Sequence, residues 1–140
     1  MGEIREYDGY VVQNVAFESL PGVFVTGSLY MPNENQGKIP GILSPHGHWT
    51  KPGEVGRYRP NAQKRFASMA RMGAIVWDCD AVGYGQMEEI GWEHGEGEVL
   101  KLQLWNSIRS VDFMLSLGAD PNKLAVTGAS GGGTQSFLLA

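Results

Sequence analysis

A serine flanked by glycines is the feature of this sequence that most clearly suggests chemistry. Residues 128–132 have the sequence Gly-Ala-Ser-Gly-Gly, a G-x-S-x-G pattern centred on Ser130. In such a pattern the serine sits on a tight, strained turn between a strand and a helix, with its hydroxyl raised above the surface. The apolar runs 124–127 and 137–140 predict that strand and that helix. We therefore predict that Ser130 is a nucleophile.

The glycines around this serine have predicted roles of their own. Gly128 and Gly132 are expected to support the turn, because side chains at these positions would collide. The helix that starts at Gly131 points its N–H groups and the positive end of its dipole at the serine, so the Gly131 N–H is the expected first oxyanion donor. A plain glycine-rich turn is the alternative, and the strand–turn–helix setting weighs against it. A phosphate-binding loop would need Lys and then Ser or Thr after its last glycine, where this chain has Thr134 and Gln135.

A second polar loop, His46-Gly47-His48-Trp49, follows the apolar run 39–44. The backbone N–H of His48 is the predicted second oxyanion donor, since Gly47 lets the chain fold in close to a substrate. His46 is predicted to hold the loop through side-chain hydrogen bonds. A metal site formed with His94 is the alternative, but zinc sites usually have more ligands at firmer spacing. We therefore predict no metal.

Acidic residues lie in and after the apolar run 74–79. Asp80 is predicted to support the site structurally, by capping the turn that leads into residues 83–85. Asp78 is a further carboxylate in this run, and a catalytic role for either acid is the weaker alternative. Arg109 and Asp112, three positions apart, are expected to form a surface ion pair.

The surrounding elements must bring these loops together. Residues 10–19 and 23–31 flank Pro21-Gly22 and predict an antiparallel hairpin. Helices are predicted over 62–72 and over 100–117, the second with an apolar stripe. The stripe consists of Leu104, Ile108, Val111 and Leu115. Strands that alternate with helices predict an α/β protein with a mostly parallel sheet, whose functional loops lie at the carboxyl ends of its strands.

The composition excludes several classes of protein. The 140 residues are 42% hydrophobic and 19% charged with a net charge of −4, and no basic patch suggests nucleic acid. No apolar stretch approaches the roughly 20 residues of a membrane span. The first residues lack a signal peptide, which leaves the compartment open, because a signal could have been removed. Cys79 is the only cysteine, so the chain can form no internal disulfide.

Taken together, these motifs resemble the acetylxylan-esterase-like branch of the α/β-hydrolase superfamily, over essentially the whole chain. The most specific parts are the loop at 45–49 and the block at 127–135. Further matching segments are 20–22, 25–27, 29–32, 80–85, 105–109 and 112–113. The resemblance implies a serine carboxylic-ester hydrolase that needs no cofactor and removes acetyl groups from sugars, xylan or other small esters.

The resemblance also implies that part of the site is missing. In this superfamily the triad acid and histidine follow the serine along the chain. Here His46, His48 and His94 all precede Ser130, and ten residues follow it. Residues 1–140 are therefore expected to be the N-terminal portion of one α/β-hydrolase domain, cut off after the serine turn and weakly active or inactive alone. An exposed sheet edge would favour self-association.

Two other functions remain open at the level of the sequence. The chain could be a non-catalytic scaffold or dimerisation module with a hydrolase fold. It could also be a peptidase or a dienelactone-type hydrolase with the same serine turn. Its acyl and alcohol specificity are not predicted.

Overall fold

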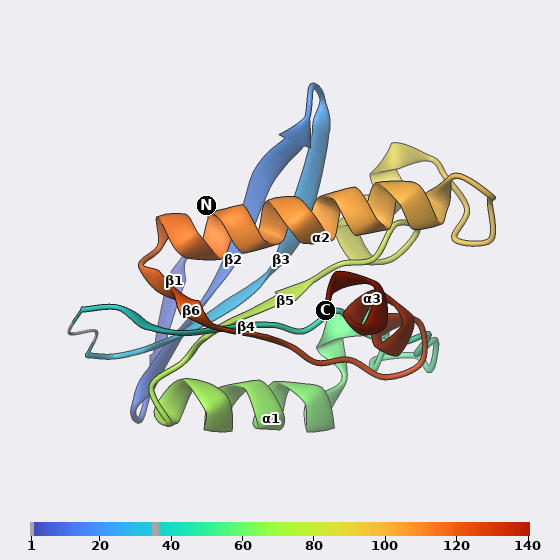
Figure 1. Cartoon of the computed structure of the whole chain (residues 1–140). Helices are drawn as coiled ribbons and strands as arrows, with labels where there is room; N and C mark the ends of the chain where they lie inside the picture. Colours follow the sequence, from blue (N-terminus) through green and yellow to red (C-terminus); the bar gives the residue numbers. More distant parts are fainter. Residues whose placement is uncertain (1, 35–36) are drawn as a thin grey trace.

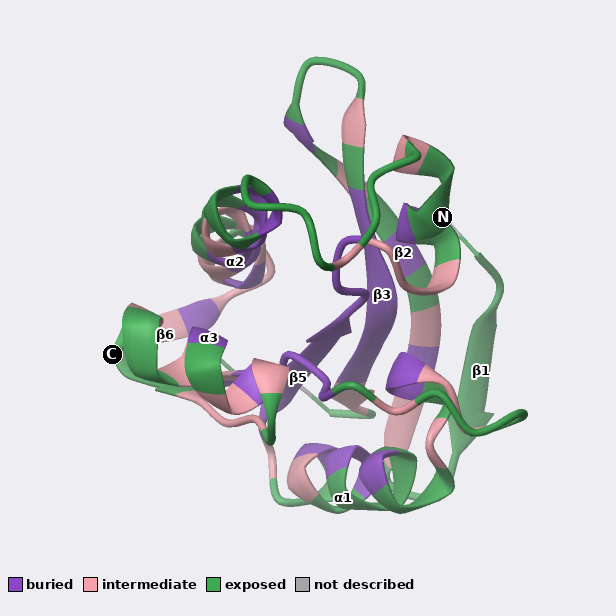
Figure 2. Ribbon diagram, turned by 90° about the vertical axis from the view of Figure 1, so that its right-hand side faces the viewer, coloured by how far each residue is buried: buried purple, intermediate pink, exposed green. Residues whose placement is uncertain are grey.

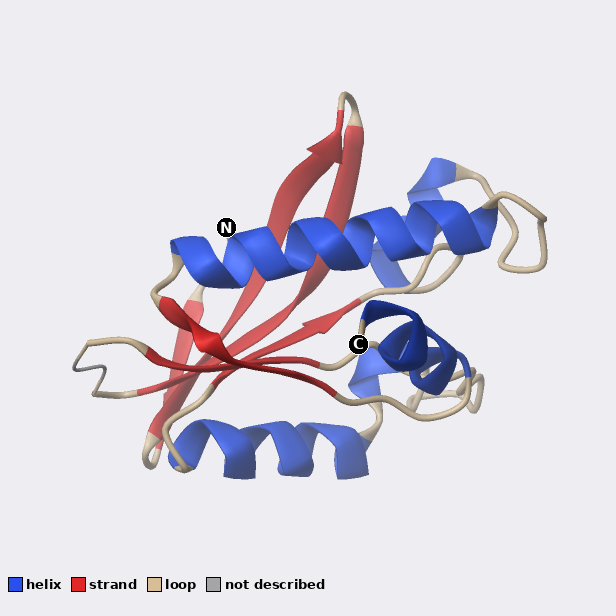
Figure 3. Ribbon diagram, viewed as in Figure 1, coloured by secondary structure: helices blue, strands red, loops and turns tan. Residues whose placement is uncertain are grey.

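The computed structural model describes residues 2–34 and 37–140, which form one sheet with helices on both faces (Figures 1 and 3). The strands are β1 (Ile4–Tyr7), β2 (Tyr10–Leu20), β3 (Val23–Pro32), β4 (Ile39–Leu43), β5 (Ile75–Cys79) and β6 (Ala119–Val126). The α-helices are α1 (Pro60–Arg71), α2 (Val99–Ser116) and α3 (Gly131–Leu139), and the 3-10 helices are η1 (Gly56–Tyr58) and η2 (Gly85–Ile90). The strand order is β1-β2-β3-β5-β4-β6.

The sheet is mixed, with a larger antiparallel part than the sequence suggested. The predicted hairpin is confirmed as β2 and β3, and β4 runs parallel to both β5 and β6. However, β3 pairs antiparallel with β5, and β1 adds another antiparallel strand to β2. The sequence analysis did not predict β1, because this strand is fully exposed and its residues do not alternate between apolar and polar. The sequence feature that indicates it is the dipeptide Asp8-Gly9, which is typical of a two-residue hairpin turn.

Two apolar layers hold the helices to the sheet. Alternate residues of a strand face opposite sides, so β5 directs Val76 towards α1 and Trp77 towards α2. Phe66 of α1 packs in the first layer and Met114 of α2 in the second. Figure 2 shows the buried middle of the sheet, in β3 and β5, between these two helices. In the described residues, no helix combines the length and the apolar character needed to cross a membrane.

The buried face of α2 differs from the predicted stripe. Ile108 of that stripe is 44% exposed, and the face turned to the protein carries several polar residues. Their hydrogen bonds set the helix rotation: Trp77 Nε1 donates to Ser110 Oγ at 3.1 Å, and Ser19 Oγ donates to Asn106 Oδ1 at 2.7 Å. Because hydrogen bonds of polar side chains determine which face of α2 is buried, the spacing of its apolar residues did not predict that face. The predicted surface ion pair between Arg109 and Asp112 is confirmed, with 2.5 Å between nitrogen and oxygen.

The chemistry-bearing loops meet at one end of the sheet. Residues 44–55 follow β4, residues 80–84 follow β5 and residues 127–130 follow β6. Since β4, β5 and β6 are parallel, their carboxyl ends share one edge, at the right of Figure 1, where α3 also begins. This is the location predicted for function in such a sheet.

Asp78 gives the fold a testable pH dependence. Its carboxyl group is fully buried and makes no hydrogen bond in the described part of the chain, and burial, reinforced by the charge of Asp80, raises its pKa well above the usual value. Above the unfolded-state pKa of about 3.9 the folded chain therefore holds one more proton, and its stability falls by about 1.4 kcal/mol per pH unit until Asp78 ionises.

We predict that Asp78→Asn removes this pH-dependent decrease in the free energy of unfolding. The free energy of unfolding of the variant, minus that of the parent, should increase as the pH is raised from about 4, as measured by urea denaturation. Asp112→Asn, at an exposed ion pair, serves as the control and should show no such trend. A difference for Asp78→Asn that does not change with pH would contradict a buried, protonated carboxyl.

Candidate active site

Ser130 lies in a strained turn between β6 and α3. Its φ and ψ are 55° and −124°, and among the described residues it alone has a positive φ without being glycine. A conformation this rare persists only where the surrounding structure enforces it, and such residues cluster at functional sites. The side chain is exposed to solvent. The predicted strand–turn–helix setting is therefore confirmed, and the nucleophilic role stays a prediction.

The turn packs directly against the loop after β4 through backbone atoms. A Cβ atom on Gly132 would overlap the carbonyl oxygen of Pro45, and one on Gly128 would overlap the backbone of Gly132. From the opposite side, a Cβ atom on Gly47 would lie 2.7 Å from the carbonyl oxygen of Ala129. Three glycines thus allow two loops to touch without intervening side chains, and their role in supporting a catalytic site stays a prediction.

His48 contacts the serine through its side chain, a contact that the sequence did not predict. Its Nδ1 lies 3.0 Å from Ser130 Oγ, and its Nε2 lies 2.6 Å from Nε2 of His94. The backbone N–H groups of His48 and Gly131, the two predicted oxyanion donors, make no hydrogen bond within residues 2–34 and 37–140. Both donors are thus left for a ligand.

His46 joins the loop after β4 to the loop after β5. The Ala81 N–H donates to His46 Nε2 at 3.0 Å, while His46 Nδ1 lies 2.9 Å from the Gly47 carbonyl oxygen and donates to it. The ring is therefore neutral, in keeping with burial, which lowers its pKa. These bonds match the holding role predicted for His46.

Asp80 makes a buried ion pair in place of the expected turn cap. Its Oδ1 accepts from Arg57 Nε at 2.8 Å, and its Oδ2 accepts from Thr26 Oγ1 at 2.7 Å. Both side chains of the ion pair are 1% exposed. A buried carboxylate needs a countercharge more than a turn needs a cap, so Asp80 is satisfied by Arg57. Asp80 still contacts the turn, because a Cβ atom on Gly85 would lie 2.5 Å from its Oδ1.

Several solved structures of esterases are similar to this chain. Methylesterase BT1017 matches 99% of this chain with a TM-score of 0.86 and 38% sequence identity. A candidate acetyl xylan esterase from Bacteroides fragilis matches 98% (TM-score 0.74, 17% identity), and an acetyl xylan esterase from Paenibacillus sp. R4 matches 96% (TM-score 0.72, 22% identity). The chain has the α/β-hydrolase fold. It spans 31%, 43% and 47% of these three structures, respectively. No family model matches the chain, and neither does any curated protein.

Two residues of this α/β-hydrolase site were missed at the level of the sequence. Arg57 comes from η1, 23 positions before Asp80, and His94 comes from the segment between η2 and α2, 46 positions after His48. Neither belongs to a short motif. The sequence indicated His94 only as one of three histidines that could together bind a metal. In the described residues no group of three or more His, Cys, Asp or Glu side chains is placed to hold a metal ion.

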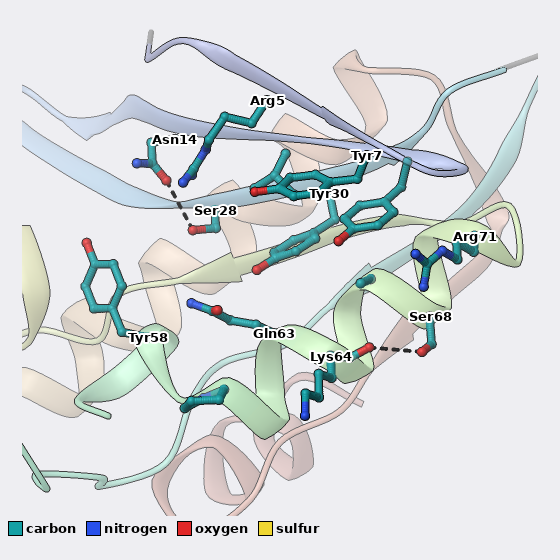
Figure 4. Close-up of a pocket in the computed structure, with 14 residues that line it drawn as sticks. Arg5, Tyr7, Asn14, Ser28, Tyr30, Tyr58, Gln63, Lys64, Ser68 and Arg71 are labelled. Carbon is teal, nitrogen blue, oxygen red and sulfur yellow. Dashed lines mark hydrogen bonds between the residues drawn. The ribbon is translucent and has the colours of Figure 1, made fainter. Parts of the chain in front are cut away.

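One cavity of the described residues lies away from this site. It has a volume of about 580 Å³ and lies between the first strands and α1, with Tyr7, Tyr30, Tyr58 and Arg71 among its lining residues (Figure 4). A depression of about 360 Å³ borders His94 and Trp92 instead. Of these two hollows, the second adjoins the site, through His94.

The contact between loop and turn predicts opposite effects for two adjacent glycines of α3. Gly132→Ala would push against the Pro45 carbonyl, and we expect a loss of about 1–3 kcal/mol in unfolding free energy. Gly133→Ala is the matched control, because its Cβ atom would meet nothing nearer than 3.5 Å. Because residue 133 lies in a helix, where alanine is favoured over glycine, the unfolding free energy of this variant should exceed that of the parent by about 0.5–1 kcal/mol. Urea denaturation of both variants checks this, and equal effects would contradict the contact.

Proposed function

We propose that this chain carries the nucleophile and oxyanion hole of a serine carboxylic-ester hydrolase. The observation that carries the proposal is the strained Ser130 at the strand–helix turn, with an imidazole nitrogen 3.0 Å from its hydroxyl oxygen. A hydroxyl in this position is exposed to substrate and open to activation by a base. The esterase names of the solved neighbours support the same class of reaction.

In the proposed reaction Ser130 Oγ attacks the carbonyl carbon of an ester. The carbonyl oxygen becomes an oxyanion, which accepts hydrogen bonds from the N–H groups of Gly131 and His48. The start of α3 adds the positive end of its dipole at the same place. Collapse of the tetrahedral intermediate releases the alcohol and leaves an acyl group on Ser130, which water then hydrolyses. Apart from the ester and water, these steps use only groups of the protein.

The proposed substrates are small esters or acetylated carbohydrates. The support is the names of the neighbours, one a methylesterase and two acetyl xylan esterases, together with the sequence resemblance. A non-catalytic scaffold would have no need to hold a serine at φ 55° with two backbone donors left free beside it. An ester hydrolase is therefore favoured over a scaffold.

Covalent labelling tests this function. We predict that a fluorophosphonate probe adds once to the chain, as seen by intact mass spectrometry, and that Ser130→Ala abolishes the adduct. Ser136→Ala is the matched control: this serine lies on α3, its hydroxyl bonds back to the Gly132 carbonyl, and its variant should label like the parent. Equal labelling of Ser130→Ala and the parent, or no labelling of either, would rule out the proposed nucleophile.

A further inference from the structure

A polar face of α1 borders the cavity of about 580 Å³ shown in Figure 4. The helix residues that line this cavity are spaced three or four positions apart, so they share one side of the helix. They are Pro60, Gln63, Lys64, Ala67, Ser68 and Arg71. The residues that hold α1 to the sheet, Phe66 and Ala70 among them, lie on another side. The helix therefore has a second, polar surface that packing against the sheet does not require.

Three antiparallel strands form the opposite wall of the cavity. Arg5 of β1 lies opposite Val12 of β2, which lies opposite Tyr30 of β3. Tyr7 lies opposite Tyr10 in the same way. Residues that lie opposite each other in neighbouring strands point to the same face of a sheet, and all five line the cavity. The outer strands thus present tyrosine and arginine side chains to the polar face of α1.

Two tyrosine rings of this cavity are open to a ligand. Tyr7 is 46% exposed and stacks on Tyr10, with ring centroids 5.0 Å apart. Tyr58 is 44% exposed, and the guanidinium carbon of Arg57 lies over its ring, 4.7 Å from the centroid. Each ring is therefore supported by a neighbour and still offers surface on which a flat ligand can pack.

The length of α1 separates these two rings. Tyr58 lies just before Pro60, the first residue of the helix. Tyr7 adjoins Asp8, whose carbonyl oxygen accepts a hydrogen bond from Arg71 Nε, at the last residue of the helix. Because a helix rises 1.5 Å per residue, α1 is roughly 16 Å long. A ligand that contacts both tyrosines must therefore be extended and contain more than one ring.

An unpaired hydroxyl lies between the two ends of the cavity. Tyr30 is 5% exposed and lines the cavity, and its hydroxyl makes no hydrogen bond within residues 2–34 and 37–140. Burial raises the pKa of Tyr30, so this hydroxyl keeps its proton and can donate. Buried polar groups nearly always have a hydrogen-bond partner, so a ligand oxygen is the partner that this group lacks.

The charged residues that line the cavity are all cationic. They are Arg5, Lys64 and Arg71. Arg71 lies over the Tyr10 ring, whereas Arg5 and Lys64 form no ion pair in the described part of the chain. The chain as a whole has a net charge of −4, so three cations without a carboxylate run against its composition. The cavity is therefore complementary to an anionic ligand.

We propose that this cavity binds an acidic oligosaccharide, a chain of linked sugar rings that carry carboxylates. The C–H faces of the sugar rings pack on Tyr7 and Tyr58, because aromatic rings offer broad and rigid apolar surfaces. A sugar oxygen accepts from the Tyr30 hydroxyl, and the carboxylates pair with Arg5 and Lys64. The cavity is distinct from the serine site, and this binding does not depend on the proposed hydrolase function.

A nucleotide is the other ligand that combines a flat ring with negative charge. Phosphate sites usually use backbone N–H groups at a helix N-terminus or in a glycine-rich loop. Here α1 begins with Pro60, which has no N–H, and the lining consists of strand residues, one face of α1 and Tyr58. A nucleotide also has a single base, which cannot reach two rings separated by the length of α1. The oligosaccharide is therefore favoured.

Nitrogen-15 NMR titrations of this chain test the proposal with matched sugars. The probes are trimers of glucuronate, mannuronate and galacturonate, each compared with the neutral hexose trimer of the same linkage. We expect at least one acidic trimer to shift backbone signals of β1 and α1 and to bind about 10-fold more tightly than its neutral counterpart. Salt screens exposed charges, so roughly 0.5 M sodium chloride should reduce this preference.

Two pairs of variants separate the aromatic from the ionic contribution. Tyr58→Ala should weaken binding of acidic and neutral trimers alike by about 3- to 10-fold, whereas Phe137→Ala, at an exposed ring of α3, should change neither. Lys64→Gln should weaken the acidic trimer by about 2- to 5-fold and leave the neutral trimer unchanged. Lys101→Gln, at an exposed lysine of α2, is its matched control. All four residues are exposed, so the variants are expected to fold, and near-UV circular dichroism checks this.

Three results would overturn the proposed site. The first is that no acidic trimer binds, or that its signal shifts lie outside the cavity. The second is equal affinity for acidic and neutral trimers. The third is tighter binding of AMP than of every acidic trimer, with shifts at the same residues. Labelling of Ser130 is measured separately, so failure of the sugar site leaves the hydrolase function standing, and loss of the hydrolase function leaves the sugar site standing.

Discussion

The close contact between the loop after β4 and the serine turn is the constraint on which the site depends. The Pro45 carbonyl occupies the space that a side chain on Gly132 would need, and Gly47 meets the turn from the other side. This contact holds Ser130 in a conformation that a non-glycine residue rarely adopts, and it brings His48 to the serine hydroxyl. The geometry of the Ser130 turn is thus determined by backbone packing at the carboxyl ends of β4 and β6.

The loop after β5 completes the site from the other side, and buried charge stabilises it. Asp80 at the start of this loop is held by Arg57, and removal of either partner would leave an unpaired buried charge, which typically costs about 3–5 kcal/mol. The same loop supplies the Ala81 N–H that binds His46 and the Val82 carbonyl that binds His94. An ion pair remote from the serine therefore supports both histidine-bearing segments.

The local patterns of the sequence predicted the fold class and the strand–turn–helix setting of Ser130, but they did not predict contacts between residues far apart in the chain. The turn at Ser130 is encoded within five residues, so its glycines predict its geometry. The ring contact of His48 depends on His94, and the state of Asp80 depends on Arg57; both partners are far away in the chain and belong to no motif. The prediction that the triad acid and histidine lie outside residues 1–140 rests on chain order and stays a prediction.

The most direct measurement is a crystal structure of this chain after reaction with an organophosphonate, which leaves a phosphonyl group in place of the tetrahedral intermediate. We predict a phosphorus atom bonded to Ser130 Oγ, with its oxygen within hydrogen-bond distance of the Gly131 and His48 N–H groups. The His48 ring should remain beside the adduct and against His94. An adduct on another residue, or a phosphonyl oxygen turned away from both N–H groups, would contradict the proposed site.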